Sequence, residues 1–590
     1  MPKITFQLLP QMASSGLKLG LCLALLGATN NVSQELAWAK PARSAAAQAD
    51  LIITNAKIYT SAQPQWQNAL AIRNGQIAQV GSNEEALKLA GPATKIFDAK
   101  AKLIMPGFHD SHVHLAEGGA ELLQCRLNSA KNRDDVLALL QKWNGENPSG
   151  KWILAAGLPL PAIAKEPLDC HILDQVSAER PILVYAEDEH SAWLNSKALQ
   201  LAKVTRETKT TCGGIIELDS KGAPSGCLRE GALALAQKVL PVLSLKDRSA
   251  ALAKAINLAN SFGITSAQEA HANNEVITAY YDLAKHHRLN LKVVAALHTG
   301  TMTPLAYKQI EAAAEKYSKY SRLSAHSAKI FADGVIESHT AALLEPYSDQ
   351  AKNNNKKQSL NFSPDELKAM VKELAKRGFQ IHIHAIGDGA VRAALDALEA
   401  APEGGDLRHQ IAHLQLVAPA DLKRFAALNV TANCQAAWAY QDPYIKDLTA
   451  PLLGSERMAR VYPFNSLKQA GARLAAGSDW TVSTLNPLEA MQTAVTRQAP
   501  KQNTVGTIEP PLNATEALEL GDIAKAYTTG GAYVNHSEKQ TGSLEVGKCA
   551  DLVMLDKNIF ELPKSEIASA KVLLTLIDGK TVYKDSNLSF

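Results

Sequence analysis

Two histidines stand one residue apart in the stretch PGFHDSHVHL, residues 106–115, at the end of an apolar run. Side chains at positions i and i+2 of a strand point to the same side, so His112 and His114 would project together where this strand stops. Two imidazoles held in this way can grip one metal ion. Taken alone, such a pair more often marks a half-exposed strand face.

Further candidate ligands stand at the ends of later apolar segments. His384 lies in FQIHIHAIGD, His413 in RHQIAHLQLV and Asp479 in ARLAAGSDW. Each has a structural alternative, a hydrogen-bonded core histidine or an aspartate that caps a turn or helix. With His112 and His114 they make five such groups, which are costly to bury without a common ligand, so the five together predict a metal centre.

The segments that carry these residues belong to a repeating pattern. Short apolar strands alternate with helical stretches, which is typical of parallel strands joined by helix crossovers. The clearest helix begins at residue 363, where SPDE supplies an N-cap serine, a first-turn proline and a capping-box glutamate. Eight units predict an α/β protein with a (β/α)8 barrel, in which chemistry sits at the carboxyl ends of the strands. The expected strands are 103–115, 263–270, 291–298, 327–334, 379–388, 408–417, 429–435 and 472–480.

The remaining chain predicts additions to the barrel of residues 105–540. Residues 51–104 and 541–590 share a texture of short strands and turns, so both chain ends are expected to form one small β-sandwich domain. The connection after the first barrel strand is too long for one loop and helix, which predicts an inserted subdomain at about 125–245. Residues 40–50 are expected to be a linker.

The N-terminus predicts export. Two lysines, Lys3 and Lys18, precede an apolar run at 19–28 that has signal-peptide length and is too short to span a bilayer. The sequence AWA at 37–39 gives the small-x-small cleavage pattern, so residues 1–39 are interpreted as a signal peptide of a periplasmic or secreted protein. The alternative is an uncleaved membrane anchor; after cleavage no stable membrane insertion is expected.

The overall composition excludes some classes of partner. The 590 residues carry 61 Lys and Arg against 58 Asp and Glu, a net charge of +3, and 46% are apolar. So small a charge on this length provides no electrostatic footprint for nucleic acid. A small-molecule partner is expected, and a homodimer is left open.

Export would place six of the seven cysteines in an oxidising compartment. Cys212 and Cys227 flank a predicted hairpin that turns at 219–222, so the two could pair across it. Two unpaired buried thiols are an equal alternative, because spacing does not establish connectivity.

Lys329, in SAKIFADG on the fourth expected strand, would lie near the same barrel mouth. A buried ammonium is repelled by divalent cations, so a lysine suits that place only when uncharged, for instance as a carbamate formed with carbon dioxide. A carbamate can bridge two metals. From the residues alone, a structural ion pair of Lys329 with Asp333 or Glu337 is preferred.

The motifs together resemble the amidohydrolase superfamily, and within it amidohydrolase family three, which includes N-substituted formamide deformylase-like enzymes. The resemblance covers nearly the whole mature chain. It implies a metal-dependent (β/α)8 barrel with a β-sandwich built from both chain ends. The motifs that carry it are MPGFHDSHVHL, DEHSAWLNSKAL, GCLREGAL, GITSAQEA, AKIFADGVIESHTAALLEPY, IHAIGDGAV, LRHQIAHLQLV, AAGSDWTVSTLNPLEAMQTAVTR and GSLEVGKCADLVMLD.

The resemblance also implies roles for individual residues. His382 is left as a neighbour that supports a ligand, because the family favours His384 as the ligand of the HIH motif. Asp479 resembles the catalytic acid/base and is counted as a ligand too. The implied metal set is His112, His114, Lys329 as the carboxylated bridge, His384, His413 and Asp479.

Other positions are less regular. Ala412 stands where a glutamate commonly precedes the histidine, and Gly389 stands where arginine is frequent. Neither departure removes a ligand, but both bear on ligand support and substrate fit. His190, Trp193 and Asn195 resemble a motif expected at the pocket wall, with local hairpin packing as an equal alternative.

The resulting prediction is hydrolysis of a C–N bond, of amide, N-formyl or N-acyl type, by metal-activated water with Asp479 as acid/base. The expected cofactor is Zn2+, as one or two divalent ions. One alternative is an ester, lactone or cyclic-amide hydrolase that uses the same site. Another is a non-catalytic regulatory or binding protein that retains the barrel, since family members have been named exoenzyme regulators.

Overall fold

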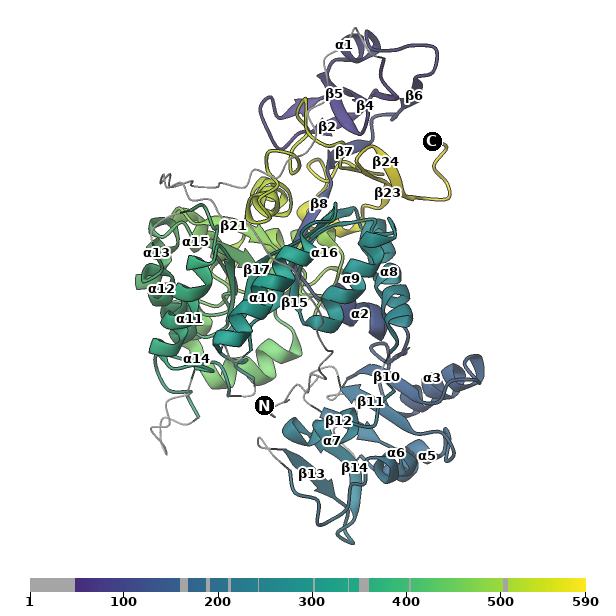
Figure 1. Ribbon diagram of the computed structural model, residues 1–590, viewed down its shortest axis with the longest axis vertical. Coiled ribbons are helices and arrows are strands. Elements are labelled where there is room, and N and C mark those ends of the chain that lie inside the picture. The colour runs from purple at the N-terminus through teal and green to yellow at the C-terminus, as the bar shows by residue number, and fades with distance from the viewer. Residues whose placement is uncertain are drawn as a thin grey trace, which may run out of the picture.

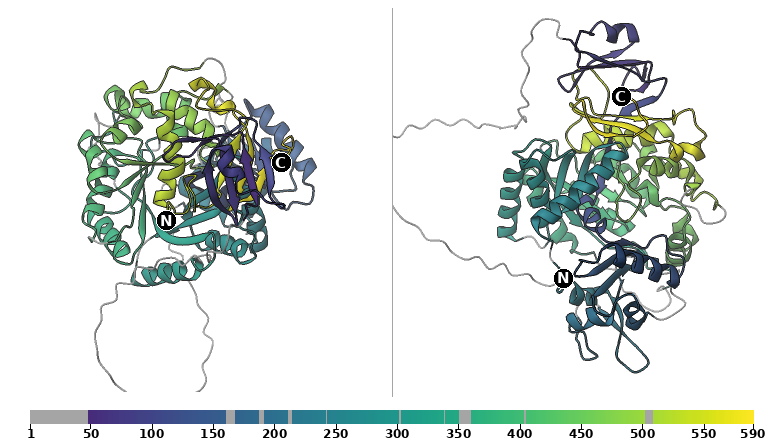
Figure 2. Two further views of the ribbon diagram at one scale, coloured as in Figure 1. Left: turned by 90° about the horizontal axis from the view of Figure 1, so that it is seen from above. Right: turned by 90° about the vertical axis from the view of Figure 1, so that its right-hand side faces the viewer.

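The structure is a computed structural model that describes residues 48–159, 168–186, 191–210, 214–241, 243–300, 303–337, 339–349, 360–402, 405–501 and 508–590. A barrel of parallel strands forms the centre of the molecule. A small β-sandwich lies at one end of the barrel and an inserted sheet lies at the other (Figure 1). The right-hand view of Figure 2 shows the same order of the three parts along the long axis.

The barrel confirms the predicted fold class. Its sheet runs in the order β21-β20-β19-β18-β17-β16-β15-β8, and every neighbouring pair is parallel. The first and last strands meet through the backbone, because the amide of Asp479 donates to the carbonyl of His112 at 2.7 Å and the amide of His114 donates to that of Trp480 at 3.0 Å. The strands are β8 (Phe108–Val113), β15 (Ile264–Ala272), β16 (Lys292–His298), β17 (Leu323–Phe331), β18 (Gln380–Ala385), β19 (Gln410–His413), β20 (Thr431–Cys434) and β21 (Arg473–Ala476).

Helices cover the outside of the barrel and bury an apolar face against it. In α11 (Pro364–Lys376) the Ser363 side chain accepts the Glu366 amide and the Glu366 carboxylate accepts the Ser363 amide, so the predicted capping box is present. The other helices of the barrel region are α2 (Leu115–Glu121), α8 (Leu245–Ser261), α9 (Asn274–Lys285), α10 (Pro304–Tyr317), α12 (Asp388–Glu399), α13 (Leu422–Ala427), α14 (Ala450–Met458), α15 (Phe464–Gln469), α16 (Pro487–Thr496), α17 (Leu520–Lys525) and α18 (Gly531–Val534).

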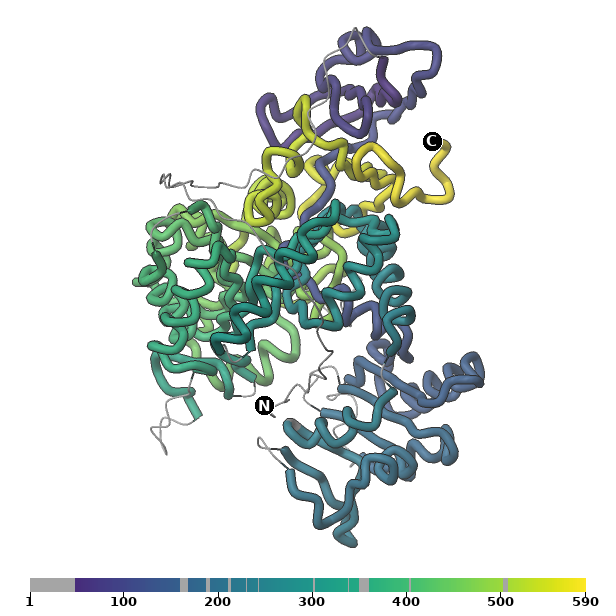
Figure 3. Tube along the Cα trace, in the orientation of Figure 1, coloured from purple at the N-terminus to yellow at the C-terminus, as the bar shows by residue number. Residues whose placement is uncertain are grey.

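The two chain ends build the sandwich together. Strands β7 and β22 pair antiparallel, with Met105 opposite Val553, so residues far apart in sequence lie side by side (Figure 3). Apolar side chains such as Ile53, Ile58 and Leu574 fill the space between the two sheets. One sheet is formed by β5 (Gln76–Gly81), β4 (Ala69–Arg73), β1 (Leu51–Thr54) and β6 (Lys95–Asp98), and the other by β24 (Lys580–Lys584), β23 (Val572–Ile577), β22 (Leu552–Leu555), β7 (Leu103–Pro106), β2 (Lys57–Tyr59) and β3 (Trp66–Gln67).

Charged groups fix the sandwich to the amino ends of the barrel strands. Lys292, the first residue of β16, contacts Asp551 at 2.6 Å and Asp578 at 2.8 Å. Arg322, next to β17, contacts Asp578 at 2.6 Å. The sandwich therefore lies opposite the carboxyl ends of these strands, where chemistry is expected.

A second charged group, the Arg408 cluster, closes the amino end beside β19. Arg408 contacts Glu538 at 2.6 Å and Asp406 at 2.7 Å, and it donates a hydrogen bond to the Tyr533 carbonyl at 2.7 Å. The Arg408 side chain is largely buried by these contacts.

The long connection after β8 carries a separate six-stranded sheet with its own apolar core. Its strands are β13 (Ile215–Leu218), β14 (Pro224–Arg229), β12 (Ser191–Leu194), β11 (Ile182–Ala186), β10 (Ile153–Leu158) and β9 (Cys125–Arg126), and its helices are α3 (Arg133–Glu146), α5 (Cys170–Asp174), α6 (Ser196–Leu201) and α7 (Leu233–Gln237). None of the helices in the described ranges is long and apolar enough to cross a bilayer.

Candidate metal centre

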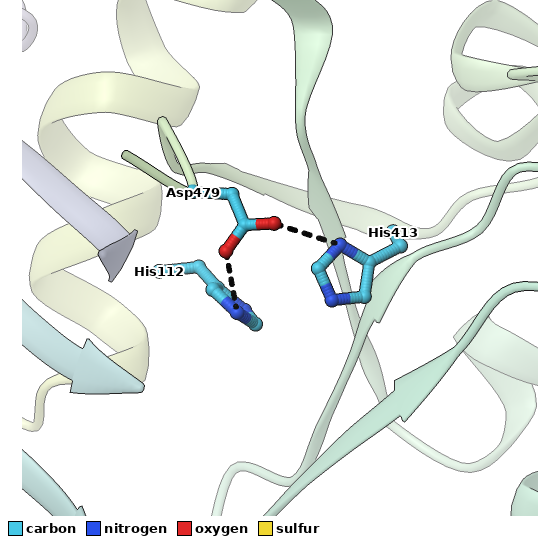
Figure 4. A group of neighbouring side chains, drawn as sticks. All are labelled: His112, His413 and Asp479. Carbon is cyan, nitrogen blue, oxygen red and sulfur yellow. Dashed lines mark ion pairs between the residues drawn. The ribbon is translucent and has the colours of Figure 1, made fainter. Parts of the chain in front are cut away.

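Three of the predicted residues meet at the carboxyl ends of β8, β19 and β21. His112 Nε2 lies 3.3 Å from Asp479 Oδ1, and His413 Nδ1 lies 3.8 Å from Asp479 Oδ2. One ligand atom from each residue lies within 4.8 Å of the other two, and all three side chains are buried. The two rings approach the two oxygens of one carboxylate (Figure 4).

The other predicted ligands border this group. His114 Nε2 lies 3.0 Å from Asp479 Oδ1, and Lys329 Nζ lies 3.2 Å from His112 Nε2. The ring centre of His384 lies 4.5 Å from that of His413. The structure thus brings together all six residues predicted to form the centre, although they come from five different strands and loops.

Around the centre, the backbone adopts conformations that residues other than glycine rarely adopt. His413 has φ 78° and Asp479 has φ 53°, both in the left-handed region. Gly477 lies so close to β8 that a Cβ would stand 2.5 Å from the His112 nitrogen. Such conformations cost about 1–3 kcal/mol each and cluster at functional sites, where surrounding contacts hold them.

Burial decides the protonation of most of the imidazoles. It lowers the pKa of His112 and of His413 well below the usual range, and it lowers the pKa of His384 to about 4. These rings are therefore neutral at pH 7, as a metal ligand must be.

The remaining two basic groups differ from these rings. Burial would lower the pKa of His114, but the hydrogen bond and charge of Asp479 outweigh it and raise the pKa to about 9. Burial lowers the pKa of Lys329 to about 7, and the attraction of Asp479 offsets only part of this shift.

Lys329 does not form the ion pair that the residues alone favoured. Among the described residues no carboxylate lies within ion-pairing distance of its ammonium. The Asp333 carboxylate instead accepts the backbone amides of Ile386, Gly387 and Ala342. Glu337 accepts the hydroxyl of Thr449. The preference for an ion pair was wrong because both carboxylates are used to fix loops.

His382 supports the first-strand ligand directly. Its Nε2 lies 2.9 Å from His112 Nδ1, and both rings are fully buried. If His112 Nε2 faces a metal, its Nδ1 must carry the proton and donate it to His382. The HIH motif therefore places one histidine in the centre and the other behind it.

Glu269, on β15, is a contributor that the sequence analysis did not single out. Its Oε1 lies 4.0 Å from His114 Nδ1, while Oε2 accepts the Tyr280 hydroxyl at 2.7 Å and the Ala116 amide at 3.2 Å. A buried carboxylate behind a histidine is a common partner of a metal ligand. The available signal was the charged residue inside the apolar segment GITSAQEA.

A chain of side-chain amides, here called the amide ladder, runs through the barrel interior to His413. Asn433 donates to Gln410 at 2.7 Å, Gln435 donates to Asn433 at 2.9 Å, and the Gln435 oxygen accepts the His413 amide at 2.8 Å. These bonds satisfy polar groups that are completely buried and hold His413 in its left-handed conformation. The amide ladder comprises Gln268, Gln380, Gln410, Asn433 and Gln435.

The predicted pocket-wall residues lie in the inserted sheet. Trp193 is fully buried on β12 and donates its indole N–H to the Asp169 carbonyl at 3.2 Å. Asn195 is also fully buried and uses its side-chain oxygen and nitrogen in four local hydrogen bonds. Both positions match the local-packing alternative. His190 lies outside the described residues.

Of the predicted cysteine pair, one residue lies within the described part of the chain. The hairpin of β13 and β14 is present, and the amide of Gly222 donates to the Asp219 carbonyl at 3.0 Å in its turn. Cys227 lies on β14, while Cys212 lies outside the described residues.

Comparison with known proteins agrees with this geometry. A profile described as the amidohydrolase family matches residues 95–583. The chain belongs to the amidohydrolase family. It is therefore a hydrolase of the amidohydrolase superfamily, with a His/Asp cluster that could hold a metal ion.

Relatives within this family cover almost the whole chain. Protein LONG AFTER FAR-RED 3 of Arabidopsis thaliana is 31% identical and covers 91% of this chain and 92% of its own. The N-substituted formamide deformylase of Arthrobacter pascens is 26% identical over 91% of this chain and 98% of its own. A solved structure, an uncharacterized metal-dependent hydrolase from Pyrococcus horikoshii OT3, has a TM-score of 0.71 at 26% identity and covers 87% of this chain and 99% of its own.

Proposed function

We propose that this member of the amidohydrolase family is an exported, zinc-dependent enzyme that hydrolyses the C–N bond of small amides of the N-formyl or N-acyl type. The observation that carries the proposal is the meeting of His112, His413 and Asp479 at one barrel end, with His114, His384 and Lys329 around them. The similarity to a formamide deformylase supports the choice of bond.

The residues fit a metal ion. His413 Nδ1 is buried beside Asp479 and has no hydrogen-bond partner within the described part of the chain. Histidine nitrogens and carboxylate oxygens are the donors that zinc prefers. When bound, zinc supplies Lewis acidity, which lowers the pKa of water to about 7 and polarises a carbonyl. The residues that would hold it are His112, His114, His384, His413 and Asp479, and His114 would release its proton when the metal binds.

Asp479 is the proposed proton carrier. Its carboxylate would accept a proton from the attacking water and then deliver it to the leaving nitrogen as the C–N bond breaks. An amide and water thereby give a carboxylic acid and an amine, with no other reactant. The contacts of Oδ1 and Oδ2 with three histidines hold the carboxylate in the middle of the centre.

After Asp479, Lys329 is the second residue that is proposed to offer an oxygen ligand to the metal, as a carbamate. Its amine would attack carbon dioxide to form a new N–C bond with release of one proton, giving a carbamate. The buried position of Nζ beside His112, without a carboxylate partner within the described residues, supports this reaction. The intact mass of the protein would then exceed that of the unmodified chain by one carbon dioxide, and two zinc ions per chain would accompany it.

The substitution Asp479→Asn tests the function. We expect turnover of a panel of N-formyl and N-acyl amines to be abolished while zinc content, measured by elemental analysis, stays nearly unchanged. An equal loss of zinc would make Asp479 chiefly a ligand. If the wild-type enzyme is inactive on the whole panel but hydrolyses esters or lactones, the proposed bond is wrong.

Export is proposed from the first 39 residues, which lie outside the described part of the chain. N-terminal sequencing of the protein recovered from the cell envelope fraction should give a start near Lys40. A mature protein that retains residues 1–39 would contradict the signal peptide.

A further inference from the structure

Two histidines that are not among the predicted ligands stand beside the centre. His271 is the second-to-last residue of β15 and His298 is the last residue of β16, so both lie at the carboxyl rim of the barrel. Their ring centres are 4.6 Å apart in an edge-to-face arrangement. In register, His298 is paired with Lys329 of β17, which places it at the level of the centre.

Phe331 connects this pair to the proposed metal ligands. Its ring centre lies 5.5 Å from His271 on one side and 5.5 Å from His384 on the other. Lys329 Nζ lies 4.8 Å from the same ring. The two imidazoles therefore border the proposed centre, with the ring of Phe331 between His271 and His384.

The pair has unused hydrogen-bonding capacity. The rings of His382 and His384 each form a hydrogen bond, to His112 and to the Gly334 carbonyl. Within the described residues, no hydrogen bond engages the ring of His271 or that of His298. His271 is half-buried and His298 is exposed, so a small molecule at the mouth can reach both.

We propose that His271 and His298 form a subsite that hydrogen-bonds an uncharged oxygen group of the substrate, such as a second amide carbonyl or a hydroxyl, while an apolar part of the substrate packs on Phe331. The proposal rests on the proposed function, because it assigns the part of the substrate that does not react. A neutral imidazole offers one N–H donor and one acceptor, which suits an amide group.

The surroundings of the pair support an uncharged group. Both rings pack against aromatic rings, and no charged side chain forms an ion pair with either of them within the described residues. A charged group placed between them would lose hydration without gaining a charged partner from the pair.

The test measures binding rather than turnover, on zinc-loaded full-length protein by titration calorimetry. Three hydroxamic acids share the same zinc-binding head and differ at the far end, which is a carboxamide, an isosteric isopropyl group or a carboxylate. We expect the carboxamide compound to bind about fivefold to tenfold more tightly than the isopropyl compound, the value of one net hydrogen bond. The double substitution His271→Phe and His298→Phe should remove this difference.

The control substitution is His286→Phe, at an exposed histidine that follows α9 on the outside of the barrel. It should preserve the preference for the carboxamide compound. Zinc content should be the same in all three proteins, and a lower content in the double variant would identify the pair as ligands and overturn the subsite.

The outcomes separate the two proposals. A double variant that keeps the wild-type preference, or a wild-type protein that shows none, overturns the subsite while leaving the hydrolase intact. Tightest binding of the carboxylate compound that disappears in the double variant overturns the assignment of an uncharged group. Failure of all three compounds to bind zinc-loaded protein overturns the metal centre and the subsite together.

Discussion

Replacing His382 by phenylalanine tests whether the centre depends on the residue behind it. His112 Nδ1 and His382 Nε2 are 2.9 Å apart, and both residues are 0% exposed, so water cannot replace a lost partner. Phenylalanine keeps the ring and removes the acceptor. A buried donor left unsatisfied costs about 1–3 kcal/mol.

This cost falls on the zinc-bound state. Without zinc, the His112 proton can move to Nε2, which faces Asp479 at 3.3 Å. With zinc on Nε2, the proton must stay on Nδ1 and meet the phenylalanine ring. The dissociation constant for zinc should therefore rise by about fivefold to 150-fold, since 1.4 kcal/mol corresponds to a factor of ten. Losses of this size are typical of groups that orient metal ligands.

The assay is competition for zinc between the protein and a chromophoric chelator. His382→Gln should restore most of the affinity, because its side-chain oxygen can accept the same proton. His109→Leu is the matched control, since His109 is a fully buried histidine on the same strand as His112 whose ring nitrogens have no partner within the described residues. Unchanged zinc affinity in a folded His382→Phe protein would refute the reasoning.

Three further predictions concern the frame of the site. Gly477→Ala should lower the free energy of unfolding by about 1–3 kcal/mol in urea titrations, because its Cβ would clash with the His112 backbone. The control Gly521→Ala, in open space on a helix, should leave this free energy unchanged or raise it. Equal effects of the two substitutions would contradict the close approach of Gly477 to β8. Asn433→Leu should cost about 1–3 kcal/mol, by the same measurement, because it leaves amide-ladder partners unsatisfied, and an unchanged midpoint would show that the amide ladder is not needed. Arg408→Met should lower the free energy of unfolding by about 1–2 kcal/mol at pH 7 and by less at pH 3. Arg408 holds the pKa of Asp406 and, against burial, that of Glu538 below their usual ranges, so the stability that is present above about pH 4 is lost as pH falls through the lowered pKa values. A loss of stability that does not depend on pH would refute this prediction.

Much of the fold could be predicted because periodicity is a local property. The alternation of apolar strands with amphipathic helices indicated eight units, and the structure has a strand in each of the eight expected segments. The capping box at Ser363 was predictable for the same reason, since its two bonds join residues three positions apart. The resemblance to a family then supplied the ligand set from motifs.

The interactions that surround the ligands could not be predicted in this way. The sequence favoured an ion pair for Lys329, because two acidic residues lie within eight positions of it. In the structure those carboxylates bind backbone amides and a hydroxyl of other segments. Trp193 and Asn195 resembled a pocket motif, but their surroundings in the inserted sheet engage them completely.

By itself the sequence determined which residue types end each strand. Because a parallel barrel presents the carboxyl ends of its strands at one rim, the sequence also determined that these residues would be neighbours: His112, His114, His384, His413 and Asp479. Only the tertiary structure decided which nitrogen of each ring faces the centre, because that depends on contacts between strands separated by hundreds of residues. His382 behind His112, Glu269 behind His114 and the amide ladder behind His413 are such contacts. Protonation followed from them as well, since burial and the position of Asp479 set the charge of each histidine.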